Sequence, residues 1–229
     1  MSRDGAWSRI QEIGIIPAVR TSNPAEAVHA AAAIRAGGIP IIEVSLAPAG
    51  ADAVLAAVVN AHRSDMLIGA GSVTDADILE SAVRAGAQFI VTPGFSEESV
   101  LKAREMGVAI FAGAITPTEV QVAAASGADA VKLFPCYSMG GPRYVRALRG
   151  QYPNIQFIAS GGVSLENCSD YVRAGACAIG VGGDIADGES MAAGDHRVFT
   201  IRAKRFREAL ANARLVWEPD RSINVGEAR

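Results

Sequence analysis

Short hydrophobic runs alternate along the chain with longer, alanine-rich segments in which hydrophobic positions recur every three or four residues. A continuous hydrophobic run predicts a strand buried on both faces, as in a parallel sheet, and the three-to-four spacing predicts an amphipathic helix. A small residue and a glycine precede several of the runs, for example at Gly86, Gly107 and Gly127. Glycine is typical of a helix C-terminus, where the chain turns through positive φ. The pattern therefore predicts a repeated strand–helix unit.

Eight hydrophobic runs predict strands, which are Ile13–Val19, Pro40–Ser45, Leu67–Ala70, Phe89–Thr92, Ala109–Gly113, Ala130–Phe134, Gln156–Ala159 and Ala178–Val181. The alanine-rich segments predict helices over Pro24–Ala36, Ala51–Ala61, Asp75–Ala85, Glu97–Met106, Pro117–Ser126, Pro142–Leu148, Leu165–Ala174 and, last, about Asp195–Leu215. Residues that cap a helix N-terminus precede four of these helices, at Asn23, Thr74, Ser96 and Thr116.

Eight alternating units with short loops predict an α/β fold, a (β/α)₈ TIM barrel that forms a single domain over residues 13–215. The alternative is a doubly wound open sheet, and it is disfavoured because no GxGxxG motif follows the first strand. We expect residues 1–12 to form a short helix across the bottom of the barrel. Residues 216–229 fit no repeat, and we expect a loosely ordered tail there.

Composition narrows the classes of function. The formal net charge is −3 with no basic stripe, so a nucleic-acid partner is not expected. The N-terminus has no signal-peptide pattern and no run of about 18 hydrophobic residues occurs, so we expect a soluble, cytoplasmic protein without a membrane partner. Three cysteines without CxxC spacing suit a reducing compartment. The three histidines fall on predicted helices and no cluster has metal-ligand spacing, so a metal-dependent enzyme is disfavoured.

Lysine is rare in this chain, since only three of the 21 basic residues are lysines, and Lys132 occupies an unusual position. It lies in an otherwise hydrophobic strand, where Val131 and Leu133 should face the helices and Lys132 the barrel interior. Burying an ammonium is costly, which favours the neutral amine, a nucleophile that attacks ketones to form an imine. The alternative is a structural pairing of Lys132 with an interior acid.

Glu43 is the expected partner of the lysine, because it is again a single charge in a hydrophobic strand. A carboxyl group beside an imine can transfer the protons that its formation and cleavage require; a purely structural counter-ion is the alternative.

Arg20 ends the first strand, where a guanidinium can bind a carboxylate or phosphate, or simply lie in solvent.

Glycine pairs follow the last two strands, at Gly161–Gly162 and Gly182–Gly183. Loops at these strands commonly bind phosphate through backbone amides in this fold, although simple tight turns are the alternative. Asp184 lies beside the second pair, and we expect it to cap exposed backbone amides at a helix start rather than to face the ligand. The cradle would then be open to phosphate, and phosphorylated substrates would be preferred.

These residues resemble the 2-keto-3-deoxy-6-phosphogluconate (KDPG) aldolase family, also called the bifunctional 4-hydroxy-2-oxoglutarate aldolases. The matching stretches are Pro17–Arg20, Ile42–Leu46, Ile68–Val73, Phe89–Gly94, Val131–Pro135 and Ser160–Val163. The resemblance implies that Lys132 forms the Schiff base, that Glu43 is the general acid/base, and that the products are pyruvate and glyceraldehyde 3-phosphate. The candidate substrate-binding residues are Arg20, Ser72, Thr92, Pro93, Phe134 and Ser160, and the candidate phosphate-binding residues are Gly161, Gly162, Gly182 and Gly183. A cytoplasmic homotrimer without metal or organic cofactor is also implied.

The chain departs from the family pattern at three points. Threonine is common in the family where this chain has Ser72 and Ser160, which keep the hydroxyl. The strand-eight loop often carries a serine, where this chain reads Gly183 followed by Asp184. The stretch Gly141–Tyr144 resembles the branch of the family that acts on the galactonate epimer, so the sugar acid stays open.

Two other classes of function remain. A sugar-phosphate isomerase or epimerase with the same fold would keep both glycine pairs and would not need an interior lysine. A non-catalytic barrel that binds a metabolite would keep Arg20 and the glycines and would tolerate the loss of Lys132.

Overall fold

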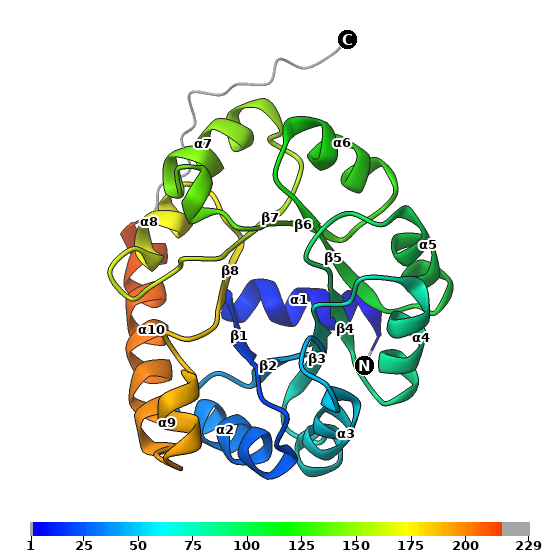
Figure 1. Cartoon of the computed structure of the whole chain (residues 1–229). Coiled ribbons are helices and arrows are strands. Elements are labelled where there is room, and N and C mark those ends of the chain that lie inside the picture. Colours follow the sequence, from blue (N-terminus) through cyan, green and yellow to red (C-terminus); the bar gives the residue numbers. More distant parts are fainter. Residues whose placement is uncertain (1, 217–229) are drawn as a thin grey trace.

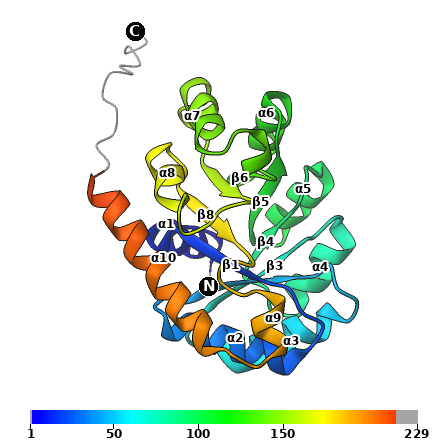
Figure 2. The ribbon, with the colours of Figure 1, turned by 60° about the vertical axis from the view of Figure 1, so that its left-hand side comes forward.

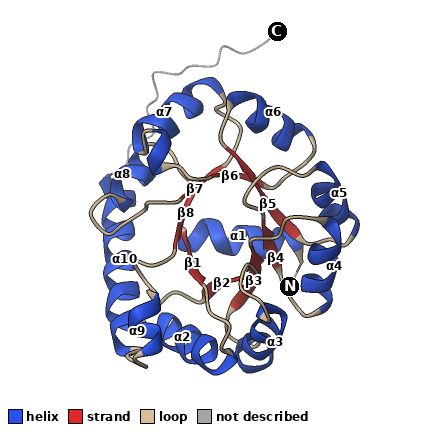
Figure 3. Cartoon of the chain, in the orientation of Figure 1, coloured by secondary structure: helices blue, strands red, loops and turns tan. Residues whose placement is uncertain are grey.

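The computed structural model describes residues 2–216, which form a closed barrel of eight parallel strands paired in sequence order. Figures 1 and 3 show the strands as an inner ring with helices around it. The strands are β1 (Ile15–Val19), β2 (Ile41–Ser45), β3 (Leu67–Gly71), β4 (Phe89–Val91), β5 (Ala109–Ala114), β6 (Ala130–Leu133), β7 (Phe157–Ser160) and β8 (Ala178–Val181). Each predicted strand is present, with ends that differ by no more than two residues, so the predicted TIM barrel is confirmed.

The helices follow the predicted alternation. They are α1 (Arg3–Ile13), α2 (Pro24–Ala36), α3 (Ala51–His62), α4 (Ala76–Arg84), α5 (Glu97–Glu105), α6 (Pro117–Ala125), the 3₁₀ turn η1 (Tyr137–Met139), α7 (Pro142–Gln151), α8 (Cys168–Arg173), α9 (Gly188–Ala192) and α10 (Arg197–Val216). The short α9 and η1 were not predicted. The expected tail, from residue 217 onward, lies outside the described residues.

Local sequence explains where the helices begin and end. Asn23, Ser96 and Thr116 each accept a backbone amide hydrogen bond as N-caps, as predicted. The prediction for Thr74 was wrong: Asp75 is the N-cap of α4 and accepts from the Ile78 amide at 2.8 Å. A carboxylate one residue later in the chain offers a stronger acceptor to the helix dipole. Glycines with positive φ follow α2, α4, α5, α6 and α8, at Gly38, Gly86, Gly107, Gly127 and Gly175.

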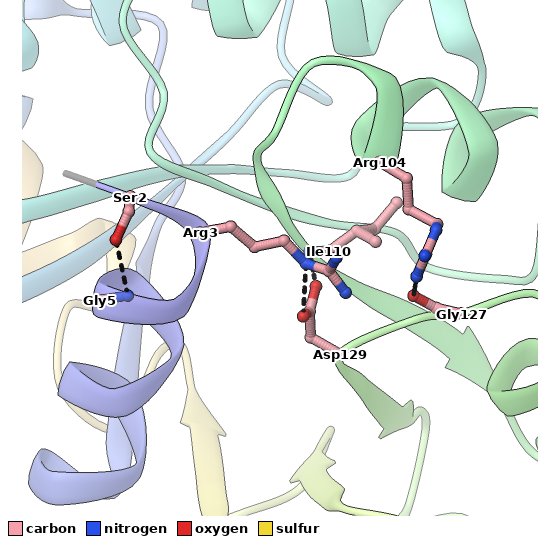
Figure 4. A network of polar contacts seen from close by, with 7 residues as sticks. All are labelled: Ser2, Arg3, Gly5, Arg104, Ile110, Gly127 and Asp129. Atoms are coloured by element: carbon pink, nitrogen blue, oxygen red, sulfur yellow. Dashed lines mark hydrogen bonds and ion pairs between the residues drawn. The ribbon is translucent and has the colours of Figure 1, made fainter.

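Helix α1 lies across the amino-terminal end of the barrel, behind the ring of strands in Figure 1. The Arg3 guanidinium contacts the Asp129 carboxylate at 2.8 Å, and the other oxygen of Asp129 accepts from the Ile110 amide at 2.9 Å, as Figure 4 shows. The Trp7 ring packs against Phe111, with centroids 5.3 Å apart. This end of the barrel is therefore closed by α1, which leaves the opposite end for a site.

Helix α10 runs along one side of the barrel and packs on α8 and α2, as Figure 2 shows. Its Phe199, Phe206 and Leu210 side chains are buried in the hydrophobic core. Within the described residues, no helix has the length and hydrophobicity needed to cross a membrane.

Candidate active site

A cavity of about 590 Å³ opens at the carboxyl-terminal ends of the strands. Its lining comes from the later residues of β1, β2, β6, β7 and β8 and from the segments that follow β1, β3, β4, β6, β7 and β8. This is the end of a TIM barrel at which catalytic residues are carried. Eleven of the twelve predicted site residues line this cavity, and they are Arg20, Glu43, Ser72, Pro93, Lys132, Phe134, Ser160, Gly161, Gly162, Gly182 and Gly183.

Lys132 lies in the middle of β6, in register with Gly113 of β5 and Ile158 of β7. Its side chain is only 8% exposed and enters the cavity, while its neighbours along the strand are part of the hydrophobic core. The side-chain nitrogen Nζ lies 5.1 Å from the centroid of the Phe134 ring. Among residues 2–216, no carboxylate lies within ion-pair distance of it. The structural pairing considered for Lys132 is therefore not seen.

Glu43 is buried on β2 and faces the same cavity from the other side of the barrel. Its carboxylate passes directly over Gly71, at the end of the neighbouring strand β3. A Cβ atom at Gly71 would lie 1.8 Å from Glu43 Oε1 and 2.4 Å from Cδ. The position of the carboxylate therefore depends on the absence of a side chain at residue 71. Glu43 and Lys132 share the cavity without forming an ion pair, which leaves space for a ligand between them.

Two serine hydroxyls form a hydrogen bond at the carboxyl-terminal ends of β2 and β3. Ser45 Oγ and Ser72 Oγ lie 2.9 Å apart, and both residues line the cavity. Ser72 has φ of +60°, a left-handed conformation that is costly for a residue with a side chain and that clusters at functional sites. Ser45 was missed as a site residue, although it follows Glu43 by two positions and so faces the same side of the strand.

Thr92 has a different place from the one expected. Its hydroxyl donates to the Gly94 carbonyl at 2.6 Å and accepts from the Gly113 amide at 2.9 Å, and the residue is not part of the cavity lining. Both hydrogen-bonding directions of the hydroxyl are thus satisfied by backbone. Thr92 ties the turn that carries Pro93 to β5, and it supports the site without facing a ligand.

The loop after β6 is held against the loop after β7. The Cys136 amide donates to the Ser160 carbonyl at 2.8 Å, and the Tyr137 amide donates to the Gly161 carbonyl at 3.0 Å. Gly161 adopts φ of +84°, and a Cβ atom there would come within 3.0 Å of the Phe134 ring. The absence of a side chain at residue 161 therefore leaves room for the Phe134 ring, which lines the cavity beside Lys132.

The loop after β8 makes a tight turn in which the Gly182 carbonyl accepts from the Ile185 and Ala186 amides. Asp184 lines the cavity, and no hydrogen bond from the described residues reaches its carboxylate. Partial burial and nearby Glu166 raise the pKa of Asp184, and Arg202 opposes them. The expected capping role of Asp184 was wrong.

The acid that caps the following helix is Asp187, which also lines the cavity. Its carboxylate accepts from the Ser190 amide and hydroxyl, both at 2.8 Å, and it pairs with Arg202. These partners, with the Arg202 hydrogen bond first, hold the pKa of Asp187 well below its usual range. Asp187 was missed because α9, with only five residues, has no periodic pattern to reveal its start.

The remaining candidate ligands lie away from the cavity. His29 and His196 pack ring against ring at 5.3 Å between centroids, and His62 contacts the Val28 carbonyl. Within residues 2–216, no group of three or more histidine, cysteine, aspartate or glutamate side chains is arranged to hold a metal ion.

Comparison with known proteins identifies close relatives. The family model for KDPG and KHG aldolases matches residues 7–201. A 2-dehydro-3-deoxy-phosphogluconate aldolase of Treponema pallidum (strain Nichols) is 34% identical over 202 residues, which cover 87% of this chain and 94% of the relative. A 2-dehydro-3-deoxy-6-phosphogalactonate aldolase of Escherichia coli (strain K12) is 33% identical over 175 residues, covering 76% of this chain and 85% of the relative.

A solved structure adds chemical information about a relative. The KDPG aldolase of Legionella pneumophila, with pyruvate captured as a covalent carbinolamine intermediate, superposes with a TM-score of 0.82 at 26% identity. The superposition covers 87% of this chain and 96% of that one.

Proposed function

Because the chain belongs to the family of KDPG and KHG aldolases, we propose that it cleaves 2-dehydro-3-deoxy-6-phosphogluconate, or a close 2-keto-3-deoxy sugar acid, through a Schiff base on Lys132. The products are pyruvate and an aldehyde, which is glyceraldehyde 3-phosphate for the phosphogluconate. The phosphogalactonate epimer and 4-hydroxy-2-oxoglutarate are the alternative substrates. The observation that carries the proposal is a buried lysine amine in the cavity, to which no carboxylate of residues 2–216 is paired.

The reaction begins when the neutral Lys132 amine attacks the C2 ketone and forms a carbinolamine. Glu43 donates a proton to the departing hydroxyl, so that water leaves and an iminium remains. A base, for which Glu43 is now available, takes the proton of the C4 hydroxyl. The C3–C4 bond breaks, the aldehyde leaves, and the bonding electrons move into an enamine. Protonation at C3 and addition of water to the iminium release pyruvate and restore the amine.

Other side chains around the cavity position the substrate. We assign the substrate carboxylate to Arg20 and the Ser45–Ser72 pair, whose guanidinium and hydroxyl groups are suited to bind an anion. Phe134 covers the imine and restricts the access of water. The backbone of the loops after β7 and β8, with Ser160, faces the far end of the sugar acid.

Pyruvate release tests this assignment. Purified protein is supplied with each candidate substrate, and pyruvate is measured with lactate dehydrogenase and NADH. We expect turnover with at least one of the sugar acids and none above background for Lys132→Met, which keeps the side-chain length without the amine. Equal turnover by Lys132→Met would refute the Schiff-base mechanism. No cleavage of any candidate by the wild-type protein would favour an isomerase or a binding protein.

We further propose a homotrimer in the cytoplasm that acts in the Entner–Doudoroff route of carbohydrate breakdown. Exposed hydrophobic side chains beside the site, Tyr137 at 62% and Met139 at 47%, support burial against another copy of the chain. The free thiols suit a reducing compartment. Light scattering should give three times the 23.7 kDa mass of the chain.

A further inference from the structure

The far end of the cavity carries negative charge. The loops after β7 and β8 form this end, and the charged side chains that they contribute to the lining are Asp184 and Asp187. A phosphate group bound by backbone amides in these loops would lie beside both carboxylates. Whether the two carboxylates oppose phosphate binding depends on how the charge of each is neutralised.

Asp187 is neutralised within the fold. Arg202 pairs with it, and the Ser190 amide and hydroxyl donate to its two oxygens. Its charge is therefore balanced by groups that hold it in place, and it contributes little repulsion toward the cavity.

Asp184 has no such compensation. Its carboxylate accepts no hydrogen bond and forms no ion pair among the described residues. Nearby Glu166 raises its pKa, and Arg202, which opposes this, is already paired with Asp187. A second hollow of about 350 Å³ lies on its other side, lined also by Glu166 and Arg205. Asp184 thus lines both hollows, and among the described residues neither of its oxygens accepts a hydrogen bond.

We propose that Asp184 is a specificity-determining residue that lowers the preference for a phosphorylated over an unphosphorylated substrate. This inference rests on the proposed aldolase function. A free carboxylate repels a phosphate dianion, and like charges placed together at a binding surface oppose binding. The same carboxylate accepts hydrogen bonds from the hydroxyl groups of an uncharged sugar end. Phosphorylated substrates can still bind through the glycine loops. Their advantage in kcat/KM over unphosphorylated substrates is smaller than it would be without the Asp184 carboxylate.

The test compares two substrates that differ only in the phosphate, KDPG and 2-keto-3-deoxygluconate. We measure kcat/KM for the wild-type protein, Asp184→Asn, which removes the charge at constant size, and Asp184→Ser. The ratio of kcat/KM for the phosphorylated substrate to that for the free one should rise about tenfold in both variants. Glu166→Gln is the matched control, because Glu166 lies beside Asp184 and lines only the second hollow; its ratio should stay within about twofold of wild type.

An unchanged or lower ratio in Asp184→Asn would overturn the proposal. Calorimetry with inorganic phosphate on the pyruvate-loaded proteins makes the same comparison without turnover, and Asp184→Asn should bind phosphate about tenfold more tightly. Borohydride trapping of pyruvate on Lys132 distinguishes a failure of the role of Asp184 from a failure of the aldolase function. If pyruvate is trapped and the ratio and phosphate affinity are unchanged, only the role of Asp184 fails; if nothing is trapped, the aldolase assignment fails.

Discussion

Replacement of Gly71 by alanine should disable the acid/base without disturbing the fold. Gly71 ends β3 and its φ lies outside the left-handed region, so its backbone accepts an alanine. The added Cβ atom would lie 1.8 Å from Glu43 Oε1, 2.4 Å from Cδ and 2.6 Å from Cγ. Non-bonded carbon and oxygen atoms need about 3 Å or more, so the carboxylate must move by more than about 1 Å. The end of a flexible side chain can make this move at modest cost in stability.

The catalytic cost is larger, because a general acid/base acts only from a position within hydrogen-bonding distance. A displacement of about 1 Å can lower a rate by about 10²-fold, which corresponds to about 2.7 kcal/mol in activation free energy. We therefore expect kcat of Gly71→Ala to fall by roughly 10²-fold, while the melting temperature changes by only a few degrees.

The assay is pyruvate release with a lactate dehydrogenase couple, together with thermal melting of each variant. Gly94→Ala is the matched control, since Gly94 follows the next strand and has no atom within 4 Å of the added methyl group. A double-mutant cycle tests whether the loss of activity arises from displacement of Glu43. Glu43→Ala removes the side chain that would clash, so adding Gly71→Ala to that variant should lower kcat by less than about threefold. Wild-type kcat in Gly71→Ala, or an equal loss with and without Glu43, would refute the reasoning.

Three further outcomes follow from the same structure. Glu43→Gln should keep the fold and lower kcat by roughly 10²-fold or more, and wild-type turnover would make Glu43 structural only. Asp187→Ala should lower the free energy of unfolding by about 1 kcal/mol at pH 7, because the helix cap and the Arg202 pair are lost. The folded-state pKa of Asp187 is lowered, so the difference in stability between wild type and variant should shrink as the pH falls below about 4. A constant difference in denaturant melts across this pH range would contradict the assignment. Burial raises the pKa of Cys136 to about 11, so Ellman's reagent at pH 8 should label this thiol only as slowly as the protein unfolds, and rapid labelling of Cys136 would argue against its burial.

The fold could be predicted because most units of the barrel repeat the same signals. Strands buried on both faces appear as continuous hydrophobic runs, and glycines such as Gly86 and Gly127 mark the helix ends with φ above +90°. The inward direction of Lys132 and Glu43 followed from the two-residue period of a strand, since a charge among hydrophobic neighbours is visible without a structure.

The details of the loops could not be predicted, because they depend on contacts between distant segments. Asp184 and Asp187 lie three residues apart, and Asp187 is the cap because α9 begins at Gly188 and the Ser190 amide donates to it; its further partner Arg202 comes from a different helix. Thr92 was expected to face the substrate, yet the amide of Gly113 on the neighbouring strand engages its hydroxyl. The clash that an added side chain at Gly71 would make with Glu43 is likewise a property of two adjacent strands in register.

The most direct test of the account is to incubate the protein with pyruvate and sodium borohydride, digest it, and locate the modified peptide by mass spectrometry. We predict a reduced pyruvate adduct on Lys132 alone. Lys102 serves as an internal control, because its hydrogen bond to Glu80 and the nearby Glu105 raise its pKa and keep it protonated, and Lys204 is an exposed lysine on α10. An adduct on Lys102 or Lys204 with none on Lys132, or no adduct at all, would contradict the assignment of Lys132 as the Schiff-base residue.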